Sequence, residues 1–386
     1  MNDADQHREL REMIEKLCAQ FTPDYWRGLD ERHEFPEAFV QAFVEGGWLG
    51  AGMPEELGGS GLGLTEAAVI MQTVAQSGAA QTGASAVHLN IFGPMPVVRY
   101  GSEALRREAI PRLISGQDRM CFGVTEPNSG LDTASLESRA ERRGNGWVIN
   151  GRKMWTTGAQ RANKILIIAR TTPKGQARKP TEGLSLFYTD LDRAHVEIRE
   201  IPKMGRHAVD TNALFIDDLP VPGEHLVGEE GQGFRYLLHG LNPERVLVAV
   251  EAVGIGRAAL QRAVAYAKQR RVFGRPIGQN QAIAHPLAKC WAELEAANLM
   301  AFKAAALFDA GEECGAEANA AKYLAGEAAF HACETAILTH GGMGYAKEYD
   351  VERFFREVMI ARIAPVSREM ILNYLAERVL GLPKSY

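Results

Sequence analysis

The sequence CFGVTEPNSG, residues 121–130, joins an apolar run to a turn rich in Pro, Asn, Ser and Gly. A run of this kind followed by such a turn predicts a short strand that ends near Val124. Backbone N–H groups and the hydroxyl of Thr125 would then be exposed at the strand end. These groups suit the polar edge of a planar heterocycle or a phosphate. On these residues alone, an ordinary turn is the alternative.

The segment around this stretch differs in pattern from the segments on either side. Residues 119–228 contain short strand-like runs between turn signals, with no long helical pattern. The flanking segments instead show helical spacing of apolar residues, as at Val246 and Val250. We therefore predict an α+β fold: an N-terminal helical domain (1–118), a middle antiparallel β-barrel or sandwich (119–228), and a C-terminal four-helix bundle (229–386).

The composition excludes several classes of protein. The chain has 386 residues, 46% of them hydrophobic, and a formal net charge of −5. Mild acidity gives no general attraction to nucleic acid or anionic membrane. The five cysteines are scattered without a CxxC pair, and no histidines stand at metal-ligand spacing, so no metal site is expected. No signal peptide or membrane span is indicated, which predicts a cytoplasmic protein.

Two further stretches carry chemical information. In GRKMWTTG, residues 151–158, Trp155 and two threonines near a strand end offer a flat apolar wall and hydroxyl donors. In RRVFGRPIGQNQ, residues 270–281, three arginines lie in a Gly/Pro loop and could bind a pyrophosphate by charge-assisted bonds. Taken singly, core packing of the tryptophan and a solvated basic loop are the simpler interpretations.

Four motifs occur together in a characteristic order. They are VTEP (124–127), G-x-K-x-W-T-T (151–157), R-x-x-F-G-x-P-I (270–277) and G-G-M-G-Y (341–345). In this order, and framed by helical, β and helical segments, they resemble the acyl-CoA dehydrogenase family. The resemblance implies FAD as cofactor, an acyl-CoA substrate, an electron-transfer flavoprotein as electron acceptor, and a homotetramer built as a dimer of dimers.

The resemblance also implies which residues contact the flavin. Those of the middle domain are Phe122, Val124, Thr125, Trp155 and Thr157. Thr125 would hydrogen-bond the pyrimidine edge, Trp155 would lie against the ring system, and Thr157 would contact the flavin near N5. Ser367 occupies the position where the family usually has a flavin-contacting threonine.

The resemblance further implies residues that contact the FAD of a neighbouring subunit or the substrate. Arg270, Phe273 and Gln281 would reach across to the pyrophosphate and adenosine of the neighbour's FAD. Gly342 would allow close backbone approach to that same FAD. Arg245 matches a family arginine near the acyl-CoA channel.

The catalytic base departs from the usual family pattern. Removal of the substrate α-proton needs a carboxylate within hydrogen-bond reach. Most relatives place a glutamate where this chain has Pro365, which has no acid–base function. Glu244 matches the base position of the isovaleryl-CoA dehydrogenase branch, and Pro243 would place it at the start of a helix. Glu251, the reserve candidate, would lie about 10 Å further along that helix, too far to serve the same α-carbon.

Two other functions fit the same fold. Pro365 permits a flavin-dependent monooxygenase, whereas Glu244 argues against it. A flavin-containing binding protein that acts on DNA is disfavoured by the net charge. The loop after VTEP also departs from its relatives, because Leu131 stands where many have a serine that contacts flavin or substrate. Ser129 is the candidate to replace that contact.

Overall fold

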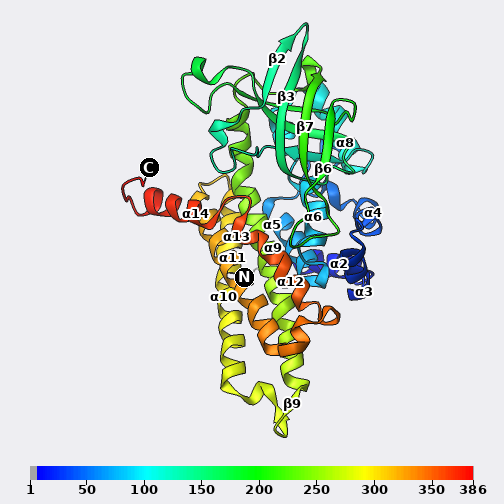
Figure 1. Ribbon diagram of the computed structural model, residues 1–386, viewed down its shortest axis with the longest axis vertical. Helices are drawn as coiled ribbons and strands as arrows, with labels where there is room; N and C mark the ends of the chain where they lie inside the picture. The colour runs from blue at the N-terminus through cyan, green and yellow to red at the C-terminus, as the bar shows by residue number, and fades with distance from the viewer. Residues whose placement is uncertain (1–6, 386) are drawn as a thin grey trace.

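The computed structural model describes residues 7–385 and begins with a group of helices (Figure 1). These helices are α2 (Arg8–Cys18), α3 (Pro23–Arg32), α4 (Glu37–Glu45), α5 (Leu64–Val74), α6 (Ala80–Ile91), α7 (Met95–Tyr100) and α8 (Glu103–Ile114). The α5–α6 junction is a sharp kink, where Gly78 and Ala80 both have positive φ, of 101° and 52°. The kink turns α6 back on the preceding helix, and all of its residues except Leu89 and Asn90 are buried.

A single sheet follows the first helices. Its strands are β1 (Met120–Gly123), β2 (Arg139–Arg143), β3 (Gly146–Thr157), β4 (Lys164–Arg170), β5 (Leu184–Asp190), β6 (Val196–Glu200), β7 (Thr211–Val221) and β8 (Leu226–Val227). Their order is β6-β7-β3-β2-β4-β5-β8, with β1 paired to β4. The predicted β domain is confirmed, but a closed antiparallel barrel is not. Strands β1 and β2 pair with β4 in parallel, and the terminal strands β6 and β8 are not paired to each other.

The chain ends in a second helical group. It comprises α9 (Gly233–Gln269), α10 (Gln281–Asp309), α11 (Gly315–His340), α12 (Val351–Val358), α13 (Ile360–Ile363) and α14 (Arg368–Tyr374). A small hairpin of β9 (Arg271–Val272) and β10 (Arg275–Pro276) links α9 to α10. The three long helices pack on one another, and α12 packs on α11, which confirms the predicted helical bundle. None of the helices within residues 7–385 combines the length and apolar character that a membrane crossing requires.

Two helix boundaries differ from the sequence prediction. Helix α9 begins at Gly233, so Pro243 lies inside the helix and does not start it. The last part of the predicted helical bundle is not continuous, because its helix ends at Ile363 and a new one starts at Arg368. Pro365 lies in that break, where the missing N–H of proline disfavours a continuous helix.

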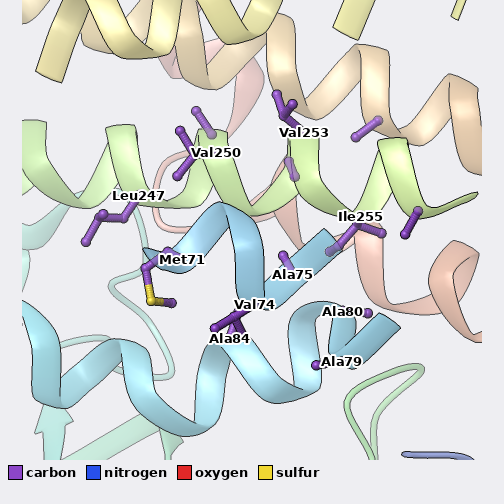
Figure 2. Packing of buried hydrophobic residues seen from close by; sticks show 14 of the residues in the cluster. Met71, Val74, Ala75, Ala79, Ala80, Ala84, Leu247, Val250, Val253 and Ile255 are labelled. Atoms are coloured by element: carbon purple, nitrogen blue, oxygen red, sulfur yellow. The ribbon is translucent and has the colours of Figure 1, made fainter. Parts of the chain in front are cut away.

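The two helical groups share one hydrophobic core. Helices α5 and α6 pack against α9 through small and branched side chains such as Ala75, Val250 and Val253 (Figure 2). Gly254 is the point of closest approach: a Cβ there would lie 2.6 Å from the carbonyl oxygen of Gln72 on α5. This tight packing fixes α5 and the kink that follows it against α9, the helix that carries the candidate base Glu244.

Candidate active site

A buried ion pair joins the two motifs predicted to contact the flavin. Lys153 of β3 is fully buried, and its Nζ donates to Glu126 Oε1 at 2.8 Å and to the Val124 carbonyl at 3.2 Å. Glu126 also accepts hydrogen bonds from the backbone N–H groups of Glu137 and Ser138. Burial lowers the pKa of Lys153 to about 8, against the opposing effect of Glu126. The pair therefore holds the VTEP turn and the Trp-Thr-Thr segment in a fixed relation.

The side chains that are predicted to contact the flavin lie where β1 ends and where β3 departs from its regular pairing with β7. The register of β3 with β7 shifts between Lys153 and Thr156, and Trp155 within this bulge has a φ of 61°. The bulge turns Trp155 outward, so that 57% of its side chain is exposed. Thr125 and Thr157 are half-buried, and the carbonyl of Thr125 accepts from the N–H of Met154 at 2.8 Å. The two threonines and Trp155 thus lie around the junction of β1 and β3, and their contacts with the flavin stay predictions.

Replacing Lys153 by Met is expected to lower the free energy of unfolding by about 3 kcal/mol, because it leaves the Glu126 carboxylate buried without its cation. Urea denaturation of the FAD-loaded protein measures the change. The double variant Lys153→Met/Glu126→Gln, which removes both charges, should regain most of the lost stability. If the single and double variants unfold alike, the ion pair does not stabilise this junction.

Glu244 belongs to a chain of buried polar side chains that links α6 and α9. Its Oε2 lies 2.8 Å from Nε2 of His88, and Nδ1 of the same imidazole lies 2.6 Å from Oε1 of Glu251. The other oxygen of Glu251 accepts from the amide of Gln81 at 2.6 Å. Glu251 is fully buried, whereas the Glu244 side chain is 34% exposed and forms the accessible end of the chain.

The protonation of this chain follows from its charges. Burial alone would lower the pKa of His88, but the two carboxylates outweigh it and raise that pKa well above the usual value. Burial works to raise the pKa of Glu244, yet the neighbouring His88 lowers it. The sequence prediction that Glu244 and Glu251 act apart is therefore incomplete, because His88 joins them. His88 could not be predicted as a site residue from the sequence, because no periodic pattern marked α6 as a helix.

Arg245 lies beside a second buried cation. Its guanidinium donates to Asn242 Oδ1 at 2.9 Å, and burial lowers the pKa of Arg245. Lys322 of α11 is buried and donates to the Val366 carbonyl at 2.7 Å. Burial and the nearby charge of Arg245 lower the pKa of Lys322 to about 8. Two adjacent cations suit an anionic part of a ligand.

Two serines expected at the site make hydrogen bonds within the chain. Ser129 is buried, and its hydroxyl donates to the Asp132 carbonyl within the loop after VTEP. Ser367 is the N-cap of α14 and accepts from the N–H of Met370 at 3.4 Å. Their contacts with substrate and flavin stay predictions. Leu131, which replaces a serine of many relatives, is 52% exposed.

The remaining cofactor-binding candidates lie at the opposite end of the bundle. Arg270 follows the last residue of α9, 26 residues after Glu244, which places it roughly 39 Å away along the helix. The adjoining hairpin projects beyond the helical body (Figure 1), and Phe273 at its turn is 99% exposed. Gln281 begins α10 and is exposed. A Cβ on Gly342 would meet no atom within 4 Å.

These residues fit FAD in two separate parts. The exposed indole of Trp155 and the hydroxyls of Thr125 and Thr157 offer a wall and polar edge for the flavin ring. Arg270, at the distant end, offers a charged fork for a pyrophosphate, and the space at Gly342 leaves room for a ligand near the backbone. The donor types suit the cofactor, although one chain does not bring both parts together.

Comparison with known proteins assigns the family. Three family models match in succession: acyl-CoA dehydrogenase N-terminal domain at residues 4–117, middle domain at 121–219 and C-terminal domain at 231–380. Acyl-CoA dehydrogenase FadE12 of Mycobacterium tuberculosis is 36% identical, covering 100% of this chain and 98% of that protein. Glutaryl-CoA dehydrogenase of Desulfococcus multivorans is 34% identical, covering 98% and 96%.

A solved structure agrees with these sequence relatives. The structure of glutaryl-CoA dehydrogenase in complex with glutaryl-CoA superposes with a TM-score of 0.92 at 30% identity, covering 100% of this chain and 98% of that one. Both helical groups and the sheet are therefore shared with an enzyme of this kind. The chain belongs to the acyl-CoA dehydrogenase family and is an FAD-dependent oxidoreductase that dehydrogenates acyl-CoA.

Proposed function

We propose that this enzyme converts an acyl-CoA thioester to the trans-2-enoyl-CoA and that Glu244 is the base that removes the α-proton. The observation that carries the proposal is the position of the Glu244 carboxylate. It is the partly exposed end of an otherwise buried polar chain, and the neighbouring His88 lowers its pKa. An ionised carboxylate with an accessible oxygen is what proton removal requires.

The usual base position supports Glu244 by exclusion. Pro365 stands there, in the break between α13 and α14, and its side chain carries no titratable group. FAD, when bound, would supply the acceptor for the hydride that leaves the β-carbon. Thr125, Trp155 and Thr157 would orient the ring from the sheet side, and Arg245 would lie along the acyl-CoA channel. Electrons would then pass to an electron-transfer flavoprotein.

The separation of the two groups of cofactor residues supports a shared site. Glu244 lies in the first third of α9 and Arg270 directly follows its last residue, so Arg270 and Phe273 would serve the FAD of a neighbouring subunit. The exposure of Phe273 fits that role, because an aromatic residue with no cover in its own chain can pack against a partner. We infer a homotetramer arranged as a dimer of dimers. A cytoplasmic location stays a prediction.

Anaerobic mixing with acyl-CoA thioesters tests the reaction. We expect octanoyl-CoA, isovaleryl-CoA or another thioester of a wider panel to bleach the visible band of the bound flavin, with formation of the 2-enoyl-CoA. Mass spectrometry identifies the product by the loss of two hydrogens. If no thioester bleaches the flavin and a product appears only with oxygen and reduced flavin, the enzyme is a monooxygenase and the proposal fails.

A further inference from the structure

His88 is a buried histidine with a carboxylate on each ring nitrogen. It projects from α6, and both carboxylates lie on α9, seven residues or about two helical turns apart. The imidazole spans that gap, with contacts of 2.8 Å to Glu244 and 2.6 Å to Glu251. Only 7% of His88 and none of Glu251 is exposed, so water does not weaken these contacts.

The contacts on both ring nitrogens fit an imidazolium held between two ionised carboxylates. An ionised carboxylate is an acceptor only, so each ring nitrogen must donate a proton for both contacts to be hydrogen bonds. A neutral imidazole has one N–H, whereas the imidazolium has two. With the imidazolium between two carboxylates, the unit of Glu244, His88 and Glu251 has one positive and two negative charges, a net charge of −1.

We propose that His88, held as an imidazolium by Glu251, is a positioning residue that keeps Glu244 ionised and directs one of its oxygens toward the substrate. The inference rests on the proposed role of Glu244 as the base. The hydrogen bond from Nε2 occupies Oε2 of Glu244, which leaves Oε1 to take the α-proton. When the C–H bond breaks and the O–H bond forms there, the unit becomes neutral. Glu251 then acts through His88 without touching the substrate.

Other charged groups near the unit lie on the loop before β7 and on α12. The Arg206 guanidinium donates to Ser85 of α6, one turn before His88, and lies near Glu251. Glu357 of α12 binds Thr82 of α6 and faces Arg206. Gln81 bonds the far oxygen of Glu251. Glu357 also forms an ion pair with Arg353 of the same helix. Of these charged groups, His88 is the one that contacts Glu244 directly.

The test uses two substitutions of His88 that separate charge from position. In His88→Gln, the amide nitrogen reaches the place of Nε2 and keeps a neutral donor to Glu244. In His88→Asn, the amide nitrogen reaches the place of Nδ1 and keeps only the bond to Glu251. Neither amide carries the positive charge. His195→Gln, in the loop before β6, is the matched control.

The measurement is the rate of anaerobic flavin reduction by the panel's best thioester, from about pH 6 to about pH 9. Loss of the imidazolium raises the pKa of Glu244, so both variants should lose about tenfold in rate at the acid end. His88→Gln should regain nearly the wild-type rate at the alkaline end. His88→Asn should stay about tenfold slower there, because Glu244 has lost its positional bond. The control should follow the wild-type profile.

Glu251→Gln provides a second test that leaves His88 in place. Without the buried anion, the imidazolium gives up its Nδ1 proton at lower pH, and the neutral ring keeps only an uncharged Nε2–H toward Glu244. We expect the rate of this variant to follow that of His88→Gln wherever the ring is neutral, and its pH profile to differ from that of the wild type. If the His88 variants fail to retain FAD, the pH profile of Glu251→Gln still tests whether His88 acts on Glu244 as an imidazolium.

The outcomes separate this inference from the proposed function. If Glu244→Gln is inactive but the profiles of His88→Gln and Glu251→Gln match the wild type, only the role of His88 is overturned. If Glu244→Gln stays active, the proposed base is wrong and the role of His88 falls with it.

Discussion

Glu244→Gln is expected to keep its FAD and to lose about 10³-fold in the rate of acyl-CoA-dependent flavin reduction, within the range for loss of a general base. The amide has nearly the shape of the carboxylate and can still contact His88, but it does not accept the α-proton at neutral pH. Stopped-flow absorbance under anaerobic conditions measures the rate. The visible spectrum of the resting protein reports whether FAD is still bound.

Glu103→Gln makes the same chemical change at a surface site of α8, where the side chain is 70% exposed. It should leave the rate unchanged. A Glu244→Gln enzyme that reduces its flavin at the wild-type rate would show that another carboxylate is the base. Glu251 would then be the next candidate, and His88 would be the group that connects it to the accessible end of the chain.

The variant Arg270→Ala/Phe273→Ala is expected to weaken FAD binding by about 100-fold or more, although both residues lie far from Glu244. The reason is that these side chains would complete the FAD site of a neighbouring subunit. The dissociation constant can be measured by adding FAD to the apoprotein and following flavin fluorescence. Arg178→Ala, at a side chain that is 88% exposed in the middle segment, is the control.

Mixing two inactive variants gives a sharper result. In a pair formed by Glu244→Gln and Arg270→Ala/Phe273→Ala subunits, one site carries both defects and the other carries none. Co-expression with random pairing should therefore restore about a quarter of the wild-type activity. If the mixture stays inactive while mass spectrometry shows mixed oligomers, Arg270 and Phe273 do not act across a subunit boundary.

The strands of the middle segment could be predicted because half-buried strands show a period of two. Strand β6 (VEIRE) alternates in this way, whereas β4 (KILIIAR) is a short continuous apolar run that is buried on both faces. Helix α6 could not be predicted in this way. It is buried on every side and consists largely of small residues, so it has no polar face to give a helical period. The first turns of α9 could likewise not be predicted, because they contain Gly240 and Pro243, which disfavour a helix.

The candidate site could be predicted only in part, because some of its contacts join residues that lie far apart in the sequence. The VTEP and Trp-Thr-Thr motifs each hold their chemical groups within a few consecutive residues, so the sequence alone identifies them. The contact of His88 with Glu244 joins residues 156 positions apart, and it depends on the kink that turns α6 onto α9. Helical spacing correctly placed Glu251 two turns from Glu244. It gave no sign of a side chain from another helix that bridges them.

The shared core of the two helical groups has a consequence for synthesis of the chain. Trp26, Phe39 and Phe43 leave the ribosome early, whereas the α9 residues of the same core, which begin at Val246, follow well over a hundred residues later. At about 5–20 residues per second, the first helices wait roughly 10–40 s for the residues that cover them. During that interval their apolar faces are exposed to other nascent chains. We therefore expect the yield of native protein to depend on chaperones that bind the first hundred residues during translation.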